Sequence, residues 1–79
     1  MRQTVIPLHE TDVPDACEKL IRKVERLELA GKRKIAIRYP SRFADDLEIA
    51  VVGERGRYRG HPAFVHDDVP YEIVIECED

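Results

Sequence analysis

The sequence predicts an α+β fold, in which a single amphipathic helix packs on one face of a mostly antiparallel four- to five-stranded sheet. Three observations lead to this prediction. A long segment after residue 12 has apolar residues at helical spacing, the later segments alternate apolar and polar residues, and short turn-forming stretches separate them. The expected element order is β-α-β-β-β-β, and residues 1–79 are expected to form a single domain.

The first strand is predicted over residues 3–8. Thr4, Ile6 and Leu8 fall on one side of such a strand, and this side is therefore expected to face the core. Pro7 has no amide hydrogen to donate to a neighbouring strand, so this strand is expected at an edge of the sheet.

The helix is predicted to begin where Thr11 or Asp12 can cap the first turn and Pro14 fits within it. Gly31 can adopt the left-handed conformation that ends a helix. The spacing of the apolar residues predicts one continuous stripe that packs on the sheet. This stripe consists of Val13, Ala16, Cys17, Leu20, Ile21, Val24 and Leu27.

The next two strands are predicted from alternation. The first is predicted over residues 34–39 and ends before Pro40. The second is predicted over residues 47–52, and we favour a strand from Glu48 onward. Because the apolar residues near this point also fit a helical spacing, residues 41–47 can instead form a helical turn. The predicted core residues of the earlier strand are Ile35, Ile37 and Tyr39.

Residues 53–56 predict a hairpin turn, followed by a fourth strand from Arg57 that Gly60 and Pro62 can bend or end. Residues 63–65 can continue this strand. The last strand follows a further turn and has the clearest alternation in the chain. Its predicted core residues are Tyr71, Ile73, Ile75 and Cys77.

The charge of the chain is unevenly distributed. The 13 basic and 16 acidic residues give a net charge of −3, yet residues 61–79 contain no base and residues 1–60 contain them all. Such asymmetry bears on partners rather than on the fold. No apolar run is long enough to span a membrane and the N-terminal residues do not resemble a signal peptide, so we expect a cytoplasmic protein without membrane contacts.

Residues suited to catalysis or metal binding are few. Cys17 and Cys77 fall on predicted core positions, which favours buried free thiols over a disulfide or redox pair. His66, Asp67 and Asp68 lie in a predicted turn, where such side chains usually cap backbone amides. Since the chain also has no nucleophile elbow, glycine-rich phosphate loop or HExxH pair, we expect a protein that is not an enzyme and has no cofactor or metal.

The strongest functional indication comes from the face of the sheet opposite the helix, which is predicted to be uncovered. A small apolar centre and charged margins are typical of protein interfaces, although an ordinary solvated face with ion pairs across its strands would show similar residues. The predicted partner-binding residues are Lys34, Ala36, Arg38, Val52, Glu72, Val74, Glu76 and Glu78.

A second hypothesis concerns nucleic acid. Arg55, Arg57 and Arg59 surround Tyr58 at a predicted turn that extends to Gly60, and guanidinium groups bind phosphates while a tyrosine ring can stack on a base. The acidic total, with an isoelectric point near 5.6, argues against a large phosphate-binding surface. These arginines can also be the solvent side of a hairpin, paired with nearby acids.

The sequence therefore favours a small non-enzymatic protein-binding module that acts through the open sheet face and the acidic C-terminal strand. Its expected partner is a second copy of the chain or a larger, partly basic protein, which can be one that handles nucleic acid. A stoichiometric inhibitor or accessory subunit fits this description. By analogy of size and charge alone, an antagonist of the anti-restriction or anti-CRISPR type is one example.

Overall fold

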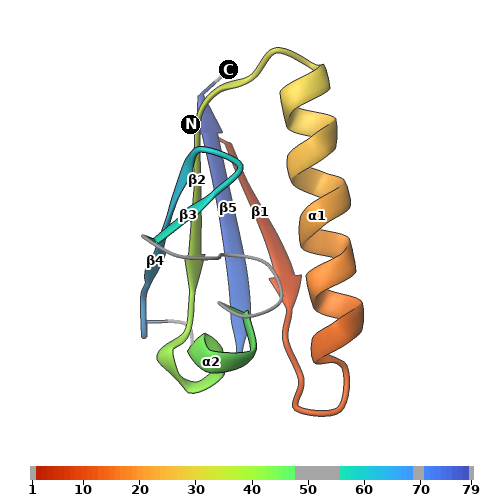
Figure 1. Ribbon diagram of the computed structural model, residues 1–79, viewed down its shortest axis with the longest axis vertical. Coiled ribbons are helices and arrows are strands. Elements are labelled where there is room, and N and C mark those ends of the chain that lie inside the picture. Colours follow the sequence, from red (N-terminus) through yellow and green to blue (C-terminus); the bar gives the residue numbers. More distant parts are fainter. Residues whose placement is uncertain (1, 48–55, 69–70, 79) are drawn as a thin grey trace.

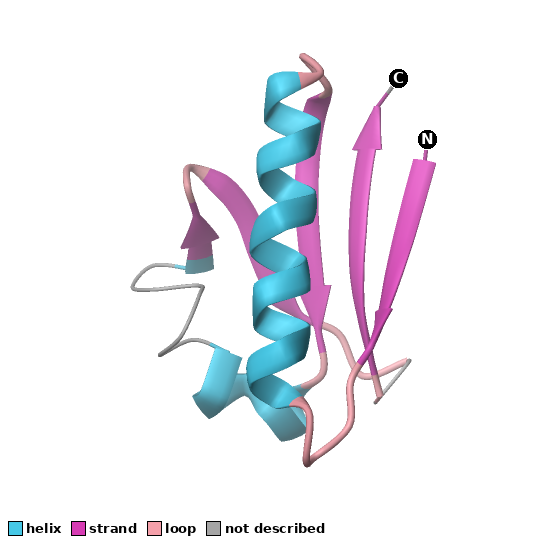
Figure 2. Cartoon of the chain, turned by 90° about the vertical axis from the view of Figure 1, so that its right-hand side faces the viewer, coloured by secondary structure: helices cyan, strands magenta, loops and turns pink. Residues whose placement is uncertain are grey.

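A computed structural model describes residues 2–47, 56–68 and 71–78. The predicted α+β class is confirmed, since one long helix lies across one face of a five-stranded sheet (Figure 1, Figure 2). The elements, in chain order, are β1 (Arg2–Pro7), α1 (Val13–Leu29), β2 (Arg33–Tyr39), the 3-10 turn η1 (Ser41–Phe43), α2 (Ala44–Leu47), β3 (Arg57–Tyr58), β4 (His61–Val65) and β5 (Glu72–Glu78).

The sheet has the strand order β1-β5-β2-β4-β3. β5 is antiparallel to both of its neighbours, β1 and β2, and β3 is antiparallel to β4. The mostly antiparallel prediction is confirmed, but β2 and β4 pair in parallel. β3 lies at the outer edge of the sheet, and the tight turn after it reverses the chain into β4. β4 therefore lies between β3 and β2, antiparallel to β3 and parallel to β2.

The predicted edge position of the first strand is confirmed, because β1 is the outermost strand next to β5. Ile6 and the following Leu8 are buried on the helix side, as their spacing predicts. Pro7 lies near the end of this edge strand, where a missing amide hydrogen is tolerated.

The ends of α1 are set by different local features. Pro14 lies in the first turn as predicted, but Asp12 at the N-cap position makes no side-chain hydrogen bond. Its ψ of 21° lies outside the extended region from which a capping side chain bonds the first turn. At the other end, Gly31 has φ +74°, its amide donates to the carbonyl of Glu28, and the amide of Lys32 donates to that of Leu27. This pair of bonds is a Schellman motif, and it confirms the predicted role of the glycine.

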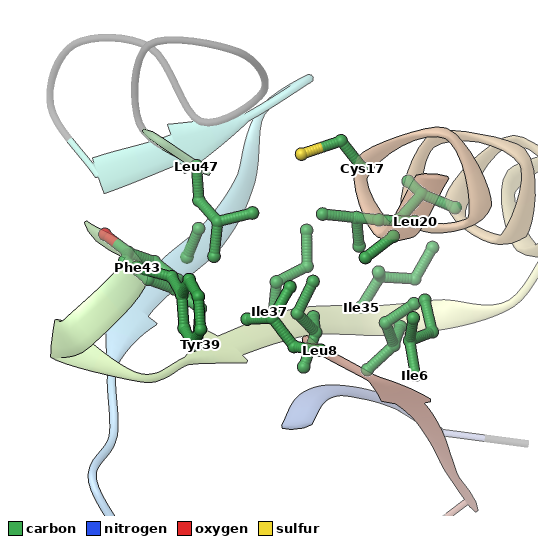
Figure 3. Close-up of a cluster of buried hydrophobic side chains, with 14 of the residues drawn as sticks. Ile6, Leu8, Cys17, Leu20, Ile35, Ile37, Tyr39, Phe43 and Leu47 are labelled. Carbon is green, nitrogen blue, oxygen red and sulfur yellow. The ribbon is translucent and has the colours of Figure 1, made fainter. Parts of the chain in front are cut away.

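A single cluster of buried side chains lies between α1 and the sheet (Figure 3). The predicted helix stripe is largely confirmed, with Val13 and Ile21 at its partly exposed margin. Cys17 and Cys77 are both buried and free, as predicted. Each fully buried aliphatic side chain contributes about 1.5–3 kcal/mol to folding. The helix contributes Ala16, Cys17, Leu20, Val24 and Leu27, and the sheet contributes Ile6, Ile35, Ile37, Tyr39, Ala63, Ile73, Ile75 and Cys77.

The helical alternative for residues 41–47 is the one that the structure shows, as η1 and α2. Phe43 and Leu47 are buried from this segment and lie beside Tyr39 at one end of the core (Figure 3). The strand predicted from Glu48 lies outside the described residues. Among those described, no helix is long and apolar enough to cross a membrane.

The predicted fourth strand is divided into β3 and β4 by a turn at Arg59 and Gly60. Both residues have positive φ, 52° and 87°, which is the geometry of a two-residue type I′ hairpin. Sequence reasoning had placed a hairpin turn at residues 53–56, of which only Gly56 is described. Arginine is not a typical first residue of a type I′ turn. The sequence therefore indicated a turn less strongly at Arg59-Gly60 than at residues 53–56, which begin and end with glycine.

Candidate functional site

On the sheet face opposite α1, a row of four side chains crosses four strands. Val5 of β1 pairs with Val74 of β5, which pairs with Arg38 of β2, which in turn pairs with Phe64 of β4. No described helix lies over this face, because α1 covers the other side (Figure 2). We define the open face as the side chains that these strands present on this side.

The row has apolar side chains at both ends and at Val74, next to Arg38. Val74 is only 8% exposed, whereas Val5 and Phe64 are 47% and 41% exposed. The two exposed apolar side chains therefore lie on opposite sides of a buried valine. Burial of Val5 and Phe64 by a partner would remove apolar area from water and favour association.

In the next row, Glu76 makes one hydrogen bond and one ion pair with side chains of the neighbouring strands. Gln3 Nε2 donates to Glu76 Oε1 at 3.0 Å, and Arg38 Nη2 lies 3.4 Å from Glu76 Oε2. The residue is only 6% exposed, although none of the described elements covers this face. A carboxylate this buried needs such partners, because an unpaired buried charge is strongly unfavourable.

Arg38 is held between this carboxylate and an aromatic ring. Its Cζ lies 5.3 Å from the centroid of the Phe64 ring, within the range of a cation–π contact. One side chain thus joins the apolar and polar parts of the open face. Arginine and aromatic residues, phenylalanine among them, are enriched at protein interfaces.

The margin of the open face carries the remaining charges. Lys34 Nζ lies 3.1 Å from Glu78 Oε2, and Glu72 is half-buried opposite Pro7. Arg38 therefore pairs with Glu76 and Lys34 with Glu78, which are ion pairs across strands of the kind that an ordinary solvated face would also show. The register of β2 with β5 explains this pair, because Ala36 lies opposite Glu76 and Glu78 follows two residues further along β5. A register irregularity lies between Arg33 and Ala36, where Lys34 has a φ of +54°.

The structure brings together seven of the eight predicted partner-binding residues on the open face, and Val52 lies outside the described residues. Sequence reasoning missed Gln3, Val5 and Phe64 as members of this face. The alternation of β1, which was used only to assign its core side, was a signal for Gln3 and Val5. Phe64 could not be assigned because the strand that contains it was not separated from β3.

The residues of the nucleic-acid hypothesis have other contacts. Arg59 Nε lies 2.7 Å from an oxygen of Glu28, which raises the pKa of the guanidinium, and Arg59 Nη1 lies 3.6 Å from Glu25. Tyr58 packs against the core, and burial raises the pKa of its hydroxyl. Arg57 is exposed and donates to the carbonyl of Gly60. Arg55 lies outside the described residues.

The turn that contains His66, Asp67 and Asp68 holds a local cap. Asp67 Oδ1 accepts hydrogen bonds from the Ser41 amide at 2.9 Å and from Ser41 Oγ at 2.7 Å, which lowers the pKa of the carboxyl. This bond fixes the start of η1, in agreement with the capping role expected of such a turn. Within the described ranges, no three His, Cys, Asp or Glu side chains are grouped as metal ligands.

A shallow groove of about 600 Å³ lies beside the start of α1. It is lined by Glu10, Val13, Pro14, Cys17, Glu18, Ile21 and Asp46. Burial and the nearby Asp46 raise the pKa of the Cys17 thiol, so the thiol is protonated at neutral pH. The groove therefore offers no activated nucleophile.

Comparison of the chain with protein-family models, with curated proteins and with solved structures finds no match.

Proposed function

We propose that this protein is a small non-enzymatic protein-binding module that acts as a stoichiometric inhibitor or accessory subunit through its open face. The observation that supports the proposal is the row in which Arg38, fixed by Glu76 and Phe64, lies between exposed apolar side chains. The contacts that orient this arginine already exist in the free chain. Binding would therefore require little ordering of its side chain.

The charge of the open face favours a partner with basic residues around an apolar patch. Its bases Lys34 and Arg38 are each paired with an acid, and Glu72 adds a further carboxylate at the margin. The margin of the face is thus acidic in total. A rim of this sign increases the rate of encounter with a basic surface, such as that of a protein that handles nucleic acid.

The test is affinity capture from the source cells with tagged wild-type protein, in parallel with and without nuclease, followed by mass spectrometry. We expect a stoichiometric partner that survives nuclease treatment. Phe64→Lys should remove this partner, because a charge replaces the exposed ring at one end of the row.

Leu29→Lys is the matched control, because Leu29 is 89% exposed at the end of α1 and the substitution also replaces an exposed apolar side chain by lysine. It should retain the partner. Capture that is equal for wild type and Phe64→Lys would contradict the use of the open face. Loss of all captured material on nuclease treatment would instead support the hypothesis centred on Arg57, Tyr58 and Arg59.

A further inference from the structure

The two edges of the sheet differ in how well they are protected against pairing with another strand. At one edge, β3 has two residues and is followed by a tight turn, and the exposed side chain of Arg57 adds charge. Short, charged edge strands are the usual protection against unwanted pairing. At the other edge, β1 has six residues, and none of its residues from Gln3 to Pro7 is charged. This second edge lacks the usual protection over most of its length.

The direction of the β1 backbone groups follows from its pairing with β5. The amide of Leu8 donates to the carbonyl of Tyr71 at 2.8 Å, and the register continues with Ile6 opposite Ile73 and Thr4 opposite Ile75. In an antiparallel ladder, alternate residues bond to the same neighbour. The backbone groups of Leu8, Ile6 and Thr4 therefore face β5.

It follows that the N–H and C=O groups of Gln3 and Val5 point away from the sheet, together with the C=O of Pro7. The missing amide hydrogen of Pro7 thus leaves the β1–β5 ladder intact. Figure 2 shows that α1 passes in front of the middle of the sheet, while β1 forms its margin beside the labelled N-terminus. Gln3 and Val5 are exposed, and no other described strand pairs with this side of β1.

We propose that β1 pairs antiparallel with β1 of a second copy of this chain, about a two-fold axis at Thr4. In this register the N–H of Gln3 donates to the C=O of Val5 of the second copy, and the N–H of Val5 donates to the C=O of Gln3. The symmetry repeats both bonds. All the outward amide donors of Gln3 and Val5 are then satisfied.

The properties of this edge fit a second copy better than a charged foreign strand. A two-fold axis places identical strands side by side, and residues 3–7 bring no like charges together. Thr4 is half-buried, and it would lie opposite its own equivalent in a favourable threonine pair. Val5, which is 47% exposed, would gain a neighbour from the second copy. The two sheets would become one, with their open faces on the same side.

A contact of one short strand buries less area than a standard protein interface, so a weak and concentration-dependent dimer is expected. The test is sedimentation or light scattering over a series from micromolar to millimolar protein. Wild type should change from the 9.1 kDa chain mass toward twice that mass. Val5→Pro should remain at the chain mass, because it removes one outward N–H and leaves the bonds to β5 in place.

Val5→Ala is the matched control, because it shortens the same side chain but retains the N–H, and it should dimerise within a few-fold of wild type. Circular dichroism and thermal unfolding establish that each variant is folded. Hydrogen exchange on the wild type provides a second measurement, since protection of the Val5 amide should rise with protein concentration.

A wild-type chain that stays monomeric at millimolar concentration would overturn the proposal. So would a Val5→Pro dimer as strong as that of wild type, or a Val5 amide whose exchange does not change with concentration. The proposal does not depend on the function of the open face, because Phe64→Lys should leave this dimer intact. A dimer abolished by Phe64→Lys and retained by Val5→Pro would place the contact on the open face instead.

Discussion

The two faces of β5 are buried to a similar degree by different means. On the helix side, Ile73 and Ile75 are 0% and 1% exposed beneath the apolar stripe of α1. On the open face, Val74 and Glu76 are 8% and 6% exposed without any described element above them. Beside them on this face lie side chains of the neighbouring strands, among them Gln3 and Arg38, which contact Glu76.

The difference lies in the contacts that each face makes. The covered face depends on apolar packing against a second layer, whereas the described contacts of the open face are a hydrogen bond and an ion pair between side chains of neighbouring strands. The two faces should therefore respond differently to substitution. A partner protein can also pack on the open face, whereas α1 already occupies the other face.

The largest expected effect concerns the thiols of the covered face. Cys17 and Cys77 are buried, and burial raises the pKa of the Cys17 thiol, so both should react slowly with a thiol reagent in the folded protein. We expect rates at least about 10³-fold below those in denaturant, because reaction requires opening of the fold. A timed labelling experiment followed by mass spectrometry measures these rates. Rapid labelling of either thiol under native conditions would show that the helix does not close this face.

The next largest effect is expected from a cavity on the same face. Ile75→Ala should reduce the free energy of unfolding by about 2–5 kcal/mol, because the residue is fully buried between strands and helix. Urea denaturation followed by circular dichroism measures the change. Val5→Ala, which shortens an exposed side chain of the open face, is the control and should change stability by less than about 0.5 kcal/mol. Equal losses in the two variants would remove the distinction between the faces.

A smaller loss is expected when the cover of the open face is disrupted. Glu76→Ala should cost about 1–3 kcal/mol, because Arg38 and Gln3 lose their shared acceptor. A double-mutant cycle with Arg38→Ala should give a coupling energy of at least about 0.5 kcal/mol. Additive effects would show that the 3.4 Å pair does not hold Arg38 in place.

The smallest effect is expected at the bulge on the margin. Lys34 has a φ of +54°, a conformation that costs a non-glycine residue about 1–2 kcal/mol. Lys34→Gly should therefore raise stability by up to about 1 kcal/mol, since the exposed pair with Glu78 contributes little. Lys34→Ala, which keeps the strain and removes the same charge, should give no gain in urea denaturation. A gain in the alanine variant would mean that the charge, and not the backbone, determines the result.

Much of the fold follows from periodicity in the sequence. The stripe of α1, the alternation of β2 and β5, and the edge position indicated by Pro7 agree with the structure, because each depends on a strong local pattern. The prediction was wrong for Tyr71, which was expected in the core but precedes β5 and is 49% exposed. The parallel pairing of β2 with β4 does not follow from local pattern. It depends on which strand occupies the inner position, and that is decided by packing between segments far apart in the chain.

The candidate site was only partly predictable for the same reason. The open-face members of β2 and β5 follow from alternation, whereas their contacts do not. The pair of Lys34 with Glu78 depends on the register between β2 and β5, which alternation within each strand does not determine. The contact of Arg38 with Phe64 requires the parallel pair of β2 and β4, which was not predicted. Arg59 forms an ion pair with Glu28 of α1, and alternation within a hairpin could not indicate this contact.

The position of β5 in the sheet has a consequence for biosynthesis. β5 separates β1 from β2, and its register joins residue 2 to residue 77. A nascent chain that has emerged only as far as β4 contains β1 and β2 but lacks β5, the strand that lies between them in the folded sheet. We therefore expect the sheet to form only after β5 has left the ribosome. Until then, α1 exposes its apolar stripe. The interval is one in which a chaperone would find a binding site on the helix.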